Sequence, residues 1–196
     1  EITFNSDELS LNETTQQIAT ELFNAWFRDF NPIFFPDIKN REVRLADWFP
    51  REFVDTEIGS IPVGWKVKKI RDVFDVTIGR TPPRKEFQWF TEDPNNGIPW
   101  VSIADLKNTF VYQNRTSEFL TPDAVDKFNI PVVQKGTVIL SFKLTVGRTA
   151  IAGMPLVTNE AIAHFDSRSN PYLDTYIFYF LRSFPFESLG STSSIG

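Results

Sequence analysis

The sequence contains no cysteine and a single histidine, His164. Without thiols the chain can form neither disulfides nor thiolate metal sites, and this composition suits a cytoplasmic protein. With one histidine, no zinc site is expected. No apolar run approaches the roughly 20 residues of a membrane span, and no signal peptide is recognisable. We therefore expect a protein without bound metal and without membrane association.

Catalytic motifs are also missing. The chain has no P-loop, no nucleophile elbow and no dinucleotide-binding fingerprint. It also lacks the Asn-Pro-Pro-aromatic motif and the glycine-rich cofactor strand of an adenine methyltransferase. His164 lies in the apolar run Ala161–Phe165 and is interpreted as a core histidine. The carboxylates of Glu92 and Asp93 belong to a polar turn. We predict that the chain is not an enzyme by itself and binds no cofactor.

Basic residues are in the minority, since the formal net charge is −5. The imbalance is uneven. Residues 1–60 hold 5 Lys and Arg against 12 Asp and Glu (5 − 12 = −7), whereas residues 61–196 hold 15 against 13 (15 − 13 = +2). Any affinity for DNA must therefore come from local clusters in the later part of the chain. An apolar share of 41% with twenty Phe is ample for a hydrophobic core.

What the sequence does contain begins with a long helix pattern. Ser10–Glu13 is a capping box, and Asn31-Pro32 ends the segment, so a helix is expected over Leu9–Phe30. Apolar residues recur along it at three- and four-residue steps. The helix either packs on its own domain or serves as a spacer that docks a partner. The docking candidates are Leu11, Ile18, Leu22, Trp26 and Phe30.

The rest divides into a linker and a domain. Residues 31–60 are rich in Pro, Asp and Phe without a period, which favours a linker with apolar anchors at Ile33–Pro36 and Trp48–Pro50. The boundary is placed near Asp55–Ile61, with one domain over residues 61–196. Its short elements predict an α+β fold, a mixed sheet with a few covering helices. The expected strands are Lys66–Ile70, Val73–Ile78, Ile98–Ile103, Thr137–Phe142, Leu144–Ile151 and Leu156–Phe165, and the expected helices start at Thr121-Pro122 and Asn170-Pro171.

Three cationic clusters are the candidate binding residues. The Gly79–Lys85 loop is stiffened by two prolines, the Lys143–Arg148 segment contains a glycine, and alternation would place Lys66 and Lys68 on one strand face. Arginine and glutamine pair bidentately with guanine and adenine, and lysine suits phosphates. Each cluster is equally open to interpretation as ordinary surface charge. Trp100 is either core or a groove wall. The candidate DNA contacts are Arg80, Thr81, Arg84, Lys85, Gln88, Lys143, Thr145, Arg148, Lys66 and Lys68.

Several short motifs, in this order, resemble one known family. They are the GxIPxGW opening at Gly59–Trp65, the GxTP loop at Gly79–Pro82, GIPWV at Gly97–Val101, Val138–Ser141 with Thr145–Ile151, Thr158–Ala161 and Leu189–Thr192. Together they resemble a target-recognition domain from the specificity subunit of type I restriction-modification enzymes. Leu11–Pro32 resembles the end of a helix that joins two such domains. The resemblance implies a fragment or a half-size version of such a subunit.

The resemblance also implies a function. Such subunits carry two recognition domains, each of which reads one half of a split DNA sequence. Their helices separate the halves and dock modification subunits, which bind S-adenosylmethionine and methylate adenine, while a restriction subunit uses ATP. The expected partners are thus double-stranded DNA, modification subunits and a restriction subunit. Two alternatives stay open: a protein-interaction module without DNA contact, and the recognition part of a single-chain restriction-methyltransferase.

Overall fold

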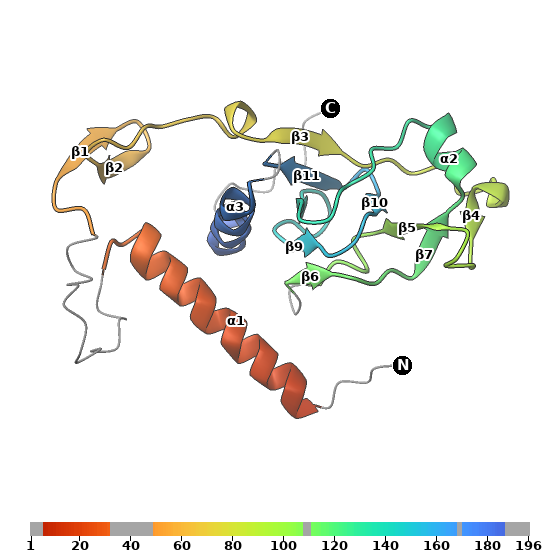
Figure 1. Cartoon of the computed structure of the whole chain (residues 1–196), viewed down its shortest axis with the longest axis horizontal. Coiled ribbons are helices and arrows are strands. Elements are labelled where there is room, and N and C mark those ends of the chain that lie inside the picture. Colours follow the sequence, from red (N-terminus) through yellow and green to blue (C-terminus); the bar gives the residue numbers. More distant parts are fainter. Residues whose placement is uncertain (1–5, 32–48, 108–110, 168–169, 187–196) are drawn as a thin grey trace. The chain divides into compact units, whose positions relative to one another are not determined.

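The computed structural model describes residues 6–31, 49–107, 111–167 and 170–186, with the backbone alone for residues 6–12 and 171 (Figure 1). The chain forms two compact units, Glu1–Val73 and Phe74–Gly196. This division lies later in the chain than the boundary expected near Asp55–Ile61. Each unit is described separately below.

The first unit begins with helix α1, Ser6–Phe27. The predicted capping box at Ser10 is wrong, because the helix already starts at Ser6 and Ser10 lies inside it. The predicted end is close to the observed one: Phe30 takes a left-handed φ of 49°, and the Asn31 amide donates to the Ala25 carbonyl at 2.6 Å. Such a turn satisfies carbonyls that the last helical turn leaves free.

A hairpin follows where a linker was expected. Strands β1 (Phe53–Thr56) and β2 (Gly59–Pro62) pair antiparallel, with Gly59 at a φ of 110° in the turn. The ring of Phe30 contacts the rings of Phe53 and Trp65 at centroid distances of 5.3 and 5.6 Å. The anchor Ile33–Pro36 and residue Trp48 lie outside the described residues.

The strand predicted at Lys66–Ile70 is wrong. Residues 66–69 have no regular structure, and a single 3-10 turn, η3, follows at Ile70–Asp72. The physical reason is that Val67 and Ile70 stay exposed, so neither face of the alternating segment gains burial. Lys66 and Lys68 therefore do not share a strand face.

The second unit contains a five-stranded sheet in the order β3-β11-β8-β9-β6. Neighbouring strands are antiparallel except β6, which runs parallel to β9. Strands β8 and β9 are buried along their whole length, since core side chains cover both faces. The strands are β3 (Asp75–Ile78), β6 (Tyr112–Gln113), β8 (Val138–Ser141), β9 (Thr149–Ala152) and β11 (Ile162–Asp166).

A second, four-stranded sheet has the order β10-β5-β7-β4, with β10 parallel to β5 and the other pairs antiparallel. The 3-10 turn η4 (Phe87–Trp89) leads into it. Buried Trp100 and Leu120 form a core cluster with residues of helix α2. The strands are β4 (Phe90–Thr91), β5 (Ile98–Val101), β7 (Glu118–Leu120) and β10 (Val157–Thr158). The prediction of an α+β domain with mixed sheets and few helices is confirmed.

Both helices of this unit begin where predicted. Thr121 caps α2 (Pro122–Lys127), and the Asn170 side chain accepts from two amides at the start of α3 (Pro171–Ser183). Helix α3 lies against β8 and β9 and buries Ile177, Phe178 and Leu181. In its first turn, Tyr172 is largely exposed. Within the described residues, no helix has the length and hydropathy needed to cross a membrane.

Candidate nucleic-acid interface

The Gly79–Lys85 loop leaves the sheet through a close backbone contact. The Gly79 amide donates to Ile162 O at 3.2 Å, and the Arg80 amide donates to Thr158 O at 2.9 Å. A Cβ atom at Gly79 would overlap the Thr158 side chain and the carbonyls of Thr158 and Asn159. Glycine is thus required here by space, and the loop is held against the turn that follows β10.

One end of the Arg80 guanidinium group is hydrogen-bonded to the protein's own backbone. Its Nη1 donates to the Phe128 carbonyl at the end of α2 at 2.8 Å, and its own carbonyl accepts from Trp100 Nε1 at 3.3 Å. Arg80 therefore braces the loop against α2, while its side chain remains exposed.

Arg84 lies over an aromatic wall and pairs with a carboxylate. Its guanidinium carbon is 4.4 Å from the ring centroid of Trp100 and 5.0 Å from that of Phe90. Its two terminal nitrogens donate to the two oxygens of Glu118 at 2.6 and 3.0 Å. The hydrogen bond to Glu118 raises the pKa of Arg84. Because Trp100 is 1% exposed, it is a core residue, and Arg84 lies on top of that core.

Glu160 connects the two cationic loops. Its carboxylate accepts a hydrogen bond from Thr81 Oγ1. That bond, together with the positive charges of Lys143 and Arg84, holds the pKa of Glu160 below its usual value. Arg84 and Lys143 belong to segments far apart in the sequence, and both act on one ionised carboxylate. One member of each of these two predicted clusters therefore lies close enough to Glu160 to act on its charge.

Arg148 is directed elsewhere. Its Nη1 donates to the carbonyls of Ile103 and Leu106 at 2.9 and 3.3 Å, and the residue is half-buried. The preceding Gly147 has a φ of 94°, and a Cβ there would lie 3.0 Å from the Phe186 ring. Arg148 therefore fixes the base of the β8–β9 loop, and its guanidinium does not join the group around Glu160.

The other candidates are mostly exposed. Lys85 and Thr145 are exposed on the two loops, and Gln88 donates to Glu86 at 3.3 Å. Lys66 and Lys68 are exposed in the first unit, so they are not placed relative to the other candidates. The sequence reasoning missed Glu118 and Glu160. Glu160 stands inside the quoted Thr158–Ala161 motif, so a search for acidic residues within the motifs would have found it.

His164 is a core residue, as predicted. It is 2% exposed, and hydrogen bonds join its Nδ1 to Thr77 Oγ1 at 2.8 Å and its Nε2 to Thr158 Oγ1 at 2.7 Å. Burial lowers its pKa to about 4. The neutral imidazole thus links β3, β10 and β11 next to the start of the Gly79–Lys85 loop. Within the described residues, no group of acidic, histidine or cysteine side chains is arranged to hold a metal ion.

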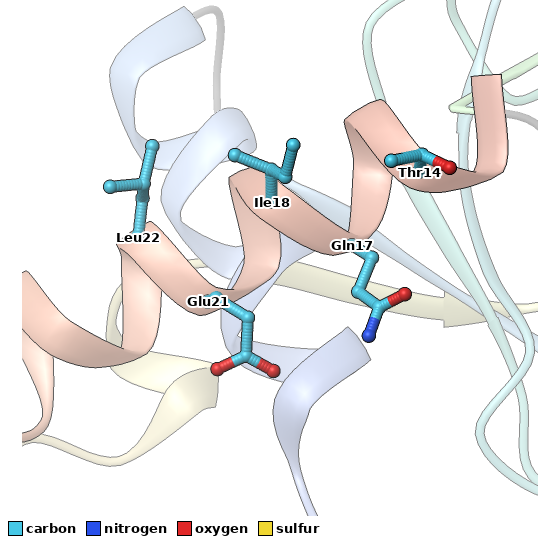
Figure 2. Close-up of a pocket in the computed structure, with 5 residues that line it drawn as sticks. All are labelled: Thr14, Gln17, Ile18, Glu21 and Leu22. Carbon is cyan, nitrogen blue, oxygen red and sulfur yellow. The ribbon is translucent and has the colours of Figure 1, made fainter. Parts of the chain in front are cut away.

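Helix α1 carries four of the docking candidates, and Phe30 follows its end. Figure 2 shows Thr14, Ile18 and Leu22 in one row along it, with Gln17 and Glu21 in the next row, and together they line a hollow of about 430 Å³. Ile18 is 56% exposed, whereas Leu22, Trp26 and Phe30 are half-buried. The side chain of Leu11 lies outside the described residues.

Comparisons with known proteins identify the family of this chain. A family profile described as "Type I restriction modification DNA specificity domain" matches residues 62–194. The type I restriction enzyme MjaIX specificity subunit of Methanocaldococcus jannaschii is 33% identical over 67% of this chain and 30% of its own length. The HindI specificity subunit of Haemophilus influenzae is 23% identical over 78% of this chain and 41% of its own length.

One solved structure, titled as the structural basis of complex assembly and conformational transition of the type I R-M system, shares the fold. Its TM-score is 0.53 at 16% identity, and the match covers 95% of this chain and 40% of that one. The fold is thus an α+β domain with two mixed sheets. The chain belongs to the family of type I restriction modification DNA specificity domains. It spans well under half the length of the curated relatives named above. The predicted family is confirmed.

Proposed function

We propose that this specificity domain binds double-stranded DNA sequence-specifically, reads one half of a bipartite target, and positions a modification subunit for adenine methylation. The observation that carries the proposal is the hydrogen bond from Thr81 of the Gly79–Lys85 loop to Glu160, a carboxylate on which Lys143 of the other loop also acts, inside the region that matches the family. Arg84 and Lys143 both contribute positive charge at this carboxylate, and Lys85 and Thr145 are exposed on the same two loops.

The charge distribution favours local contacts over a long-range field. Residues 61–196 carry a net charge of only +2, because they include 15 basic and 13 acidic residues. Non-specific attraction to phosphates is therefore weak, and affinity has to come from a close fit. Lysines at the two loops would hold the phosphates, and arginine or glutamine would read base edges in the major groove.

The chemistry belongs to partners in this proposal. A modification subunit would bind S-adenosylmethionine and take the target adenine out of the stack, since methylation of a base requires access to its edge. A restriction subunit would use ATP. The chain's own residues bind the DNA, orient it and discriminate between sequences.

Helix α1 is the proposed docking element for the modification subunit. Thr14, Ile18 and Leu22 form a row at four-residue spacing, and the exposed Ile18 lies at its centre (Figure 2). An apolar row in a hollow is the kind of surface into which a partner helix packs.

The decisive experiment is methylome sequencing of a host with and without this gene. We expect a bipartite methyl-adenine motif that disappears with the gene. A methylome that does not change would contradict the proposal. A salt titration of duplex binding separates it from the interaction module, because phosphate contacts make the affinity fall as salt rises.

A further inference from the structure

The tip of the β8–β9 loop carries an unusual leucine. Leu144 is 94% exposed, and its φ is 61°, in the left-handed region. A left-handed conformation costs a residue other than glycine about 1–2 kcal/mol. The side chain offsets none of this by burial, so folding alone gives no reason for a leucine at this position. Backbone strain of this kind gathers at functional sites.

The base of the same loop is held firmly. The Gly147 amide donates to Ser141 O at 2.9 Å, the Ser141 amide donates to Arg148 O at 2.9 Å, and Ser141 Oγ accepts from the Arg148 amide at 3.1 Å. The Arg148 guanidinium group adds its two bonds to the carbonyls of Ile103 and Leu106. The loop therefore presents Leu144 from a pre-organised base, which lowers the entropy lost when the tip binds a ligand.

The chain neighbours of Leu144, Lys143 and Thr145, are polar, and Val146, 50% exposed, is a second apolar side chain of the loop. Lys143, the preceding residue, contributes positive charge at Glu160, as does Arg84, and Thr145 follows. An apolar side chain among such groups finds few apolar partners on DNA. In the major groove, the base edges offer the C5 methyl group of thymine for this contact.

We infer that Leu144 is a specificity-determining residue that reads thymine, with its isobutyl group packed on a thymine C5 methyl while Lys143 holds the adjacent phosphate. This inference rests on the proposed function, because it needs DNA at the two loops. It adds an apolar reading element to a surface whose other candidates are all polar.

The first test is selection from a random duplex library. Wild type, Leu144→Ala, Leu144→Gly and the control Val132→Ala, an exposed valine of the same unit, are used side by side. The selected duplexes are sequenced. We expect wild type and the control to enrich the same motif, and the two Leu144 variants to lose the preference at one A·T position only.

The second test removes the methyl group from the DNA. Each thymine of the selected motif is replaced in turn by deoxyuridine. We expect one replacement to weaken wild-type binding by about fourfold, the factor that corresponds to one buried methyl group. The same replacement leaves both Leu144 variants unaffected. Thermal melting shows whether the variants fold, and Leu144→Gly relieves the left-handed strain, so its melting temperature should not fall.

The outcomes separate the two proposals. If wild type enriches a motif and the Leu144 variants enrich the identical motif, the role of Leu144 is refuted while DNA reading stands. If every deoxyuridine replacement acts equally on wild type and variants, the thymine contact is refuted. If wild type enriches no motif, the proposed function fails, and this inference fails with it.

Discussion

The pairing of Arg84 with Glu118 leads to a prediction about DNA affinity. Both terminal nitrogens of the arginine point at the carboxylate, so the fork that would grip a phosphate or a guanine is already occupied. Glu118 thus competes with DNA for the same donors. We expect Glu118→Gln to strengthen binding to a mixed-sequence duplex, because the amide holds the guanidinium group less tightly and removes one negative charge.

The size of the gain follows from exposure. The side chains of Arg84 and Glu118 are 51% and 38% exposed, so solvent screens the pair. Exposed pairs of this kind contribute about 0.5–1 kcal/mol. Releasing that energy corresponds to roughly a twofold to fivefold gain in affinity. The stacking on Trp100 does not involve the carboxylate and should keep Arg84 in place.

The assay is equilibrium binding of a fluorescent duplex over a salt series. The matched control is Glu57→Gln, which removes one carboxylate from an exposed residue of the first unit. We expect Glu118→Gln to exceed this control most clearly at low salt. If Glu118→Gln binds no more tightly than the control, or binds more weakly, Glu118 supports the binding conformation of Arg84 and does not compete with DNA.

The remaining predictions concern stability and base preference. Gly79→Ala should lower the free energy of unfolding by about 3 kcal/mol, measured by urea unfolding, because its Cβ would overlap Thr158 and two backbone carbonyls. Arg148→Ala should cost about 2 kcal/mol of stability through its lost carbonyl bonds; a variant as stable as wild type would contradict its placement at the loop base. The folded pKa of His164, about 4, lies below the unfolded 6.5, so its contribution is complete above pH 6.5 and is lost as pH falls towards 4. The loss amounts to about 3 kcal/mol and should disappear in His164→Gln, which urea unfolding at a series of pH values would show.

Several features of the fold were predictable because their signals are local. The side chains of Thr121 and Asn170 accept hydrogen bonds from backbone amides two or three residues further along the chain. A proline fixes the first turn of each helix. The apolar run around His164 indicated its burial, since the neighbours of a core strand residue are themselves apolar. The wrong predictions came from local patterns that the folded chain does not use. Ser10 resembled a helix cap but lies inside the helix, and Lys66–Ile70 alternates in polarity but gains no buried face.

The sequence by itself determined which loops are cationic and which family the chain resembles. Only the tertiary structure decided what these cations do. Arg84 meets Glu118 and Glu160 across large separations in sequence, while Arg148 turns to the Ile103 carbonyl. The physical reason is that such pairings depend on strand register and on the approach of separate loops, which no window of neighbouring residues specifies. The strain at Leu144 has the same origin, because the hydrogen bonds at the base of its loop impose the turn.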